Sequence, residues 1–160
     1  MIENKTGMTI YLLDSSALVK RYVPETGSLW VQGITDPAAT NMLYVARISG
    51  AEVVSAVTRR QRRGQITAPD AAVALDSFRC DFPAGYLILE ITADSVALAM
   101  NMAERHGLRG YDAVQLAAAL ELCDQCRLLG LLEPTLVAAD TELNLAAAAE
   151  GLMVDNPNDH

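Results

Sequence analysis

Short apolar runs alternate with longer helical segments along the chain, and this alternation restricts the possible folds more than any other feature. Four runs, at residues 9–13, 42–46, 86–91 and 135–138, are rich in β-branched and aliphatic side chains, which is typical of buried strands. A shorter run at 152–154 predicts an edge strand. Strands that alternate with helices form parallel sheets covered on both faces. We therefore expect one α/β domain, a three-layer α/β/α sandwich around a parallel sheet of about four to five strands.

Capping residues and glycine or proline stops set the expected helices. Ser15 and Ser16 offer caps for the first, Ser49 and Glu52 have the spacing of a capping box, and Thr92 begins a helix that Gly107 closes. The predicted helices cover residues 17–22, 28–35, 49–63, 69–82, 92–106, 112–128 and 140–150. The domain then spans residues 9–154, with an N-terminal extension at 1–8 and a polar tail at 155–160.

Composition and charge narrow the functional classes. The 160 residues, 51% of them apolar, suit a single core of ordinary size. The sequence shows neither a membrane-spanning run nor a signal peptide, so we expect a soluble, cytoplasmic protein. A net charge of −8 argues against holding nucleic acid by bulk electrostatics. That objection weakens because the arginines are clustered and several carboxylates can face a bound cation.

Cysteine and histidine chemistry is not favoured. Cys123 and Cys126 form a Cys-x-x-Cys late in a helical segment, where the helix dipole disfavours a reactive thiolate. A structural zinc site would need two further ligands, and His106 and His160 are the only histidines. We therefore expect buried, reduced thiols. His106, directly before Gly107, is expected to cap its helix, and Trp30 to lie in the core or on a dimer face.

Four carboxylates are the candidate chemical groups. Asp14 directly follows the first predicted strand and Asp140 the fourth, while Glu52 and Asp112 lie near helix N-termini. Ligands of open α/β sheets bind at the carboxyl ends of the strands, where all four could converge. Each acid alone also fits a structural role as a helix cap or a partner of the helix dipole. Together they would repel one another and raise their own pKa values, a cost that Mg²⁺ or Mn²⁺ would remove.

Four segments of the chain resemble the PIN-domain family, in particular VapC-type toxins of bacterial toxin–antitoxin pairs. They are YLLDSSALVKRYVPETGS at 11–28, ISGAEVVSAVTRRQRRG at 48–64, HGLRGYDAVQLAAAL at 106–120 and LVAADTELNLAAAAEGL at 136–152. The resemblance implies a parallel sheet with helices on both sides, a homodimer, cleavage of RNA with Mg²⁺ or Mn²⁺, and silencing by an antitoxin protein.

The resemblance also implies residue roles. Asp14, Glu52, Asp112 and Asp140 correspond to the family's metal-binding, catalytic acids. Ser16 matches the hydroxyl that hydrogen-bonds near the first of them, and Glu142 is a peripheral fifth acid. One position departs from the family pattern: Ala138 stands where a threonine or serine commonly precedes the last aspartate. A missing hydroxyl could weaken the orientation of Asp140 or of a water.

Basic residues near the acids have two interpretations. Arg59, Arg60, Arg62 and Arg63 close the second acid-bearing helix, where cations also complement the helix dipole. As a functional surface, Arg59, Arg62 and Arg63 would hold RNA phosphates or dock an acidic antitoxin segment. Lys20 and Arg21, soon after Asp14, could contact substrate by proximity.

Two other functional classes remain to be weighed. A phospho-acceptor module would need a second aspartate two residues after Asp14 or a lysine after a late strand, and the sequence offers Ser16 and no lysine beyond Lys20. A catalytically weak or inactive PIN-like binding module, acting through a protein partner, is the second alternative, favoured by Ala138 and the negative charge.

Overall fold

Five parallel strands form the centre of the molecule. The computed structural model describes residues 7–160, so most of the extension predicted at residues 1–8 lies outside the described residues. The strands are β1 (Ile10–Leu13), β2 (Met42–Ala46), β3 (Leu87–Leu89), β4 (Thr135–Val137) and β5 (Met153–Asp155). Their order in the sheet is β3-β2-β1-β4-β5, and every neighbouring pair is parallel. The predicted α/β class and parallel sheet are confirmed.

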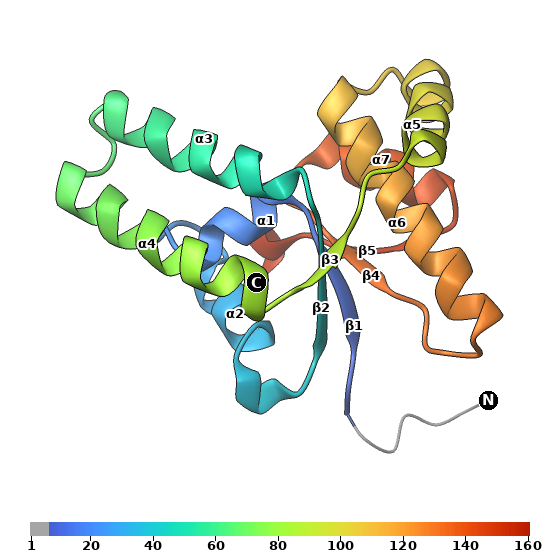
Figure 1. Ribbon diagram of the computed structural model, residues 1–160, viewed down its shortest axis with the longest axis horizontal. Helices are drawn as coiled ribbons and strands as arrows, with labels where there is room; N and C mark the ends of the chain where they lie inside the picture. The colour runs from blue at the N-terminus through green and yellow to red at the C-terminus, as the bar shows by residue number, and fades with distance from the viewer. Residues whose placement is uncertain (1–6) are drawn as a thin grey trace.

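Helices cover both faces of this sheet (Figure 1). The α-helices of the described residues are α1 (Ser15–Leu18), α2 (Ser28–Ile34), α3 (Ser49–Arg62), α4 (Ala68–Ala84), α5 (Ala93–His106), α6 (Gly110–Leu128) and α7 (Thr141–Ala149). Short 3-10 turns add η1 (Val19–Arg21), η2 (Pro37–Ala39) and η3 (Pro157–Asp159). In Figure 1, α1 to α4 lie on one side of the sheet and α5 to α7 on the other, which gives three layers.

Alternating side chains along the strands supply two separate cores. Ile10 and Leu12 of β1 belong to the cluster that includes Leu116 of α6 and Leu143 of α7. Leu13, on the opposite face, belongs to the cluster that includes Val53 of α3. Because β1 contributes to both, its position is fixed from both sides, and so is that of the residue that follows it, Asp14.

Several element boundaries differ from the sequence prediction by one or more residues, and three of the differences have clear local reasons. The first helix begins at Ser15 because Asp14, rather than a serine, is its N-cap. The long helix begins at Gly110, two residues before Asp112, with Arg109 as N-cap. The helix predicted to stop at residue 82 continues to Ala84, with Pro83 accommodated in its last turn.

The C-terminal residues fold back onto α2 instead of extending from the domain. Asp155 belongs to β5, and η3 contacts α2. Gly27, the N-cap of α2, has φ 83°, and a Cβ there would collide with the backbone of Pro157. Beyond η3, the ring of His160 stacks on Trp30 with centroids 4.2 Å apart. Trp30 is therefore half-buried beneath the end of the chain.

The order of the sheet places a ligand crevice next to β1. The chain passes from β1 to β2 on one side, whereas β4 pairs with β1 on the other. Such a reversal opens a crevice at the carboxyl ends of the two central strands. Asp14 follows β1 and Asp140 follows β4, so both acids lie at that crevice. Within residues 7–160, no helix is long and apolar enough to cross a membrane.

Candidate active site

Asp14 is the most deeply buried of the candidate acids, with a relative exposure of 2%. Its Oδ1 accepts hydrogen bonds from Ser16 Oγ at 2.7 Å and from the backbone nitrogen of Ala17 at 3.0 Å. Burial raises the pKa of Asp14 to about 7, against the opposing effect of these two bonds. The charges of Glu52 and Asp112 raise this pKa further. Asp14 is thus a poorly solvated carboxyl group that interacts electrostatically with two other acids.

Glu52 faces the same region from the first turn of α3. Gln115 of α6 donates from Nε2 to Glu52 Oε2 at 2.8 Å and to Ser49 Oγ at 2.9 Å. Burial raises the pKa of Glu52, hydrogen bonds from Gln115 and Ser15 lower it, and the charge of Asp112 raises it. The capping box predicted for Ser49 and Glu52 is wrong: the N-cap is Ile48, without a side-chain cap bond. The Ser49 hydroxyl points into the protein, where it accepts from the Gln115 amide.

Asp112 links these two acids to the end of β4. It lies in the first turn of α6, and burial raises its pKa. The charges of Asp140 and Glu142 raise this pKa further, while Arg109 lowers it. Mutual repulsion was expected to raise the acids' pKa values; for Asp14, Glu52 and Asp112 the rise is present, but burial is its larger cause.

Asp140 and Glu142 form the more exposed side of the acidic region. Asp140 caps α7, accepting from the backbone nitrogen of Leu143 at 2.9 Å. The Ser16 hydroxyl, which donates to Asp14, also accepts from the backbone nitrogen of Ala139 at 2.8 Å. One serine therefore connects the loop after β1 with the loop after β4. The methyl group of Ala138 is fully buried, so this residue adds no polar group to the site.

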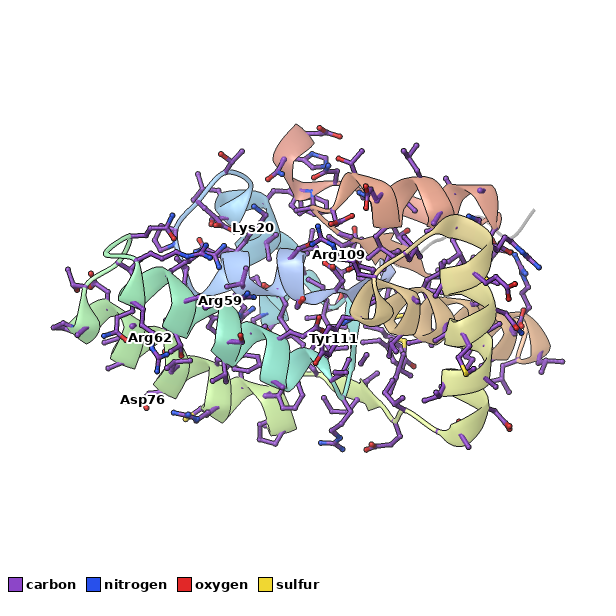
Figure 2. All side chains as sticks on the ribbon, turned by 90° about the horizontal axis from the view of Figure 1, so that it is seen from above. Lys20, Arg59, Arg62, Asp76, Arg109 and Tyr111 are labelled. Carbon is purple, nitrogen blue, oxygen red and sulfur yellow. The ribbon has the colours of Figure 1, made fainter. Side chains whose placement is uncertain are left out.

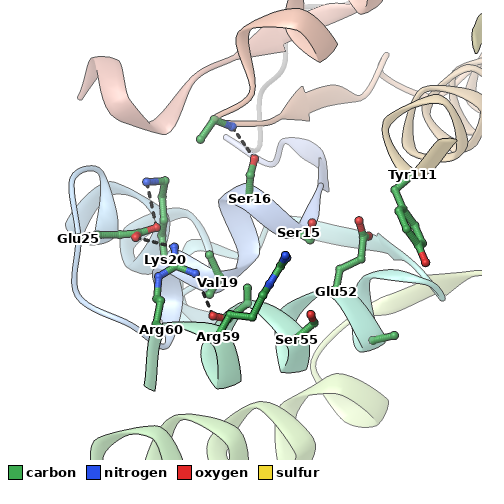
Figure 3. Close-up of a pocket in the computed structure, with 13 residues that line it drawn as sticks. Ser15, Ser16, Val19, Lys20, Glu25, Glu52, Ser55, Arg59, Arg60 and Tyr111 are labelled. Atoms are coloured by element: carbon green, nitrogen blue, oxygen red, sulfur yellow. Dashed lines mark hydrogen bonds and ion pairs between the residues drawn. The ribbon is translucent and has the colours of Figure 1, made fainter. Parts of the chain in front are cut away.

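A cavity of about 730 Å³ adjoins these acids (Figure 3). Figure 3 shows Glu52 and Tyr111 at one side and Lys20, Glu25 and Arg60 at the other, with Arg59 between them. Ser15 and Ser16, which directly follow Asp14, also line the cavity. One end of the cavity is thus acidic and the other carries cations.

The predicted basic contacts divide into two groups. Lys20 is almost fully buried, and its Nζ lies 3.2 Å from Glu25 Oε1. Arg21 is directed away from the acids, donating to the backbone oxygen of Thr35 at 2.7 Å. Arg59, Arg62 and Arg63 are exposed and have no ion-pair partner among residues 7–160. Of these three, Arg59 alone lines the acid-bearing cavity. In Figure 2, Arg59 lies nearer than Arg62 to Tyr111.

Several residues of the site were not predicted. Gln115 orients Glu52. The sequence could have indicated Gln115, because it is a polar residue one helical turn after Asp112 in an otherwise apolar stretch. Tyr111, 61% exposed beside Asp112, and Arg109 also border the acids. Glu25 binds two cations of the cavity, and nothing in its local sequence indicates this.

The alternative chemistry of cysteine and histidine finds no support in the described residues. Cys123 and Cys126 are buried and free, as predicted, and burial raises the pKa of both thiols. His106 was expected to cap its helix; its Nε2 instead lies 2.6 Å from Glu150 Oε1, and Gly107 provides the C-cap. The two cysteines lie in a hydrophobic core cluster, whereas His106 lines a pocket that it shares with Glu142.

The fold and the site together define an α/β protein whose carboxylates gather at the carboxyl edge of a parallel sheet. No protein-family model matches the chain. The chain is 33% identical over 149 residues to ribonuclease VapC45 and to ribonuclease VapC49, both of Mycobacterium tuberculosis, with 92% of this chain and 95% of each relative covered. The chain belongs to the VapC family of PIN-domain proteins.

Two solved structures share the fold of this chain. FitAcB from Neisseria gonorrhoeae superposes with a TM-score of 0.60 at 19% identity, covering 93% of this chain and 98% of that chain. VapBC2 from Rickettsia felis, bound to a promoter DNA fragment, gives 0.59 at 18% identity, covering 92% and 98%. At these identities the likeness shows the fold alone.

Proposed function

We propose that this protein is a metal-dependent endoribonuclease that hydrolyses RNA phosphodiester bonds as the toxin of a toxin–antitoxin pair. The observation that carries the proposal is the burial of Asp14 at the β1–β4 crevice, within the electrostatic reach of Glu52 and Asp112. A carboxyl group kept near pKa 7 by burial is poised to exchange its proton for a cation. The names of the two M. tuberculosis relatives support ribonuclease as the activity.

The acids fit a Mg²⁺ or Mn²⁺ ion that keeps part of its water shell. No group of three His, Cys, Asp or Glu side chains within residues 7–160 is arranged to hold an ion by itself. Mg²⁺ does not need such a cage, because it commonly binds one or two carboxylates and several waters. Asp14 and Asp112 would be the principal ligands, with Glu52 and Asp140 contributing directly or through water. When bound, the ion would lower the pKa of a water and neutralise charge on the phosphoryl group.

The surrounding residues orient the acids for this task. Both hydrogen bonds to Asp14 are accepted by Oδ1, so Oδ2 has no donor among the described residues and can face an ion. Gln115 holds Glu52 in one orientation, and the positive charge of Arg109 favours the ionised form of Asp112. These contacts restrict the carboxylates before any substrate arrives, which is the requirement for electrostatic preorganisation.

The partners that we propose follow from the family. Regulation by a cognate antitoxin is supported by the fold shared with FitAcB and VapBC2. We also propose that the protein acts as a homodimer in the cytoplasm, where its RNA substrate is available. The alternative is a catalytically weak PIN-like module that acts through a protein partner, and Ala138 is the observation that favours it.

One experiment tests the proposed activity. The purified protein should cleave end-labelled RNA with Mg²⁺ or Mn²⁺, and EDTA should stop the reaction. Asp14→Asn and Asp112→Asn should each lower the cleavage rate by about two orders of magnitude or more. Asp76→Asn is the matched control, because Asp76 is exposed on α4 and has no hydrogen bond or ion pair within residues 7–160. If the two site variants cleave as fast as the control, the acids are not the active site. Metal binding without cleavage by the unaltered protein would favour the binding module.

A further inference from the structure

A second cavity extends the acid-bearing one along α3. It has a volume of about 430 Å³ and shares four lining residues with the first: Glu25, Ala56, Arg59 and Arg60. Beyond the shared part it is lined by Arg63 and Gln65. The two cavities therefore form one continuous groove, which we call the α3 groove, from Glu52 at the acidic end to Gln65.

The sequence of α3 places cations on the groove side at a regular spacing. Arg59 follows Glu52 by seven residues and Arg63 follows it by eleven, so all three lie on nearly the same stripe of the helix. At about 1.5 Å per residue, Arg59 and Arg63 are about 10 and 16 Å along the axis from Glu52. Arg62 lies on a different side of the helix and lines neither cavity.

The cations of the groove differ in whether they already have a carboxylate partner. Glu25 binds Lys20 Nζ at 3.2 Å and Arg60 Nη2 at 2.8 Å, so both of these cations are already neutralised. Arg59 and Arg63 are exposed and have no ion pair within residues 7–160. A bound anion would therefore meet Arg59 and Arg63 first. Guanidinium groups match the geometry of phosphate oxygens, so these two arginines suit a phosphate backbone.

The other end of the groove carries an exposed aromatic ring. Tyr111 lines the first cavity beside Asp112 and is 61% exposed (Figure 3). A cationic groove combined with an exposed aromatic side chain is a common arrangement for single strands, whose bases are free to stack. In a duplex the bases are already stacked and paired, so Tyr111 would have nothing to hold.

We propose that the α3 groove binds single-stranded RNA next to the cleavage site, with Arg59 and Arg63 on successive backbone phosphates and Tyr111 against a base on the opposite side of the acids. This proposal rests on the proposed function and adds the substrate class and the path of the strand. The strand would then cross the acids, with the contacted phosphates on one side of them and the stacked base on the other.

The test measures binding apart from cleavage. In an Asp14→Asn background with EDTA present, the affinity for a short fluorescein-labelled single-stranded RNA is followed by anisotropy at several salt concentrations. Arg59→Gln and Arg63→Gln should each weaken binding by about three- to tenfold and reduce the salt slope by about 0.7, the value for one phosphate of a single strand. Tyr111→Ala should weaken binding by a similar factor without changing the slope. The same RNA annealed to its complement should bind more weakly than the single strand.

Arg62→Gln is the matched control, because it removes the same charge from the same helix outside the groove. Equal losses for Arg62, Arg59 and Arg63 would overturn the proposal, since binding would then follow net charge alone. Equal affinity for single strand and duplex would overturn it as well. Failure of the proposed function has a different signature: the unaltered protein would not cleave RNA with metal, whereas the pattern of the three arginine variants would still report on the groove.

Discussion

Gln115 Nε2 donates a 2.8 Å hydrogen bond to Glu52 Oε2 and thereby joins α6 to α3 across the acidic region. Gln115 is 1% exposed, and its Oε1 is buried without a hydrogen-bond partner among the described residues. The amide is therefore only partly satisfied, which is costly for a buried group. This cost indicates that Gln115 contributes more to the arrangement of the acids than to the stability of the fold.

Replacing Gln115 by leucine should separate its role in the site from its role in the stability of the fold. Glu52 loses the bond that fixes one oxygen, so we expect the RNA cleavage rate to fall about tenfold. Because that bond lowers the pKa of Glu52, the acid limb of the pH–rate profile should shift to higher pH. Thermal stability should fall only modestly: the buried Ser49 hydroxyl loses its Gln115 partner, but the unsatisfied Oε1 is removed as well. A large loss of stability with an unshifted pH profile would assign Gln115 to the fold alone.

The raised pKa of Asp14 makes stability without metal depend on pH. Between the pKa of an unfolded aspartate, near 4, and about 7, the folded protein holds a proton that the unfolded chain has lost. This contribution to stability is complete below pH 4 and is lost as the pH rises to 7. In EDTA, Asp14→Asn should therefore gain stability over the unaltered protein from pH 5 to pH 8, by at most about 4 kcal/mol.

Urea denaturation of both proteins at each pH measures this difference. Asparagine retains an oxygen for Ser16 Oγ and the nitrogen of Ala17, so the comparison isolates the charge. Asp76→Asn, at an exposed position, should show no such dependence. A constant stability difference between Asp14→Asn and the unaltered protein would contradict the expectation.

The sequence was sufficient for the sheet and for the positions of two of the acids. Four apolar runs of strand character lie in the chain between helices, and a parallel sheet necessarily brings their carboxyl ends to one edge. Asp14 and Asp140 could be placed there because each directly follows such a run. Glu52 and Asp112 could be placed only near helix N-termini, and the resemblance to a known family joined them to the others.

Contacts between distant segments could not be predicted in the same way. The spacing of Ser49 and Glu52 satisfies the capping-box rule, but the partner that both residues actually contact, Gln115, is more than 60 residues away. Glu25 lies in a turn whose local sequence carries no sign of Arg60, 35 residues further on. A local sequence pattern predicts hydrogen bonds between residues close in the chain. The contacts of Ser49, Glu52 and Glu25 depend instead on how distant segments pack together.

Metal binding should release protons in a pH-dependent manner. Without metal, Asp14 is mostly protonated at pH 6 because its pKa is about 7, and a cation would displace that proton. The raised pKa values of Glu52 and Asp112 act in the same direction. Calorimetry of Mn²⁺ binding in buffers of different ionisation enthalpy should show about one proton released at pH 6 and much less at pH 8. Equal release at both values would mean that Asp14 does not ligate the ion.

Removing the carboxylate of Glu25 should strengthen RNA binding, the opposite of the usual effect of a mutation in a binding groove. Glu25→Gln keeps the shape of the side chain while releasing Lys20 and Arg60, and Lys20 Nζ retains its 2.8 Å bond to the backbone oxygen of Thr26. In the Asp14→Asn background, affinity for the single-stranded RNA should rise severalfold, and the salt slope should steepen by about 0.7 for each cation that gains a phosphate. Stability should fall by more than an exposed ion pair contributes, because the substitution leaves the charge of Lys20, which is 5% exposed, without its carboxylate partner. Glu133→Gln is the control, since it removes one carboxylate partner of the exposed Arg127, away from the groove, and should leave RNA affinity unchanged. An equal gain in both variants would show that the effect follows total charge, and a loss in Glu25→Gln would show that the two ion pairs hold the groove open.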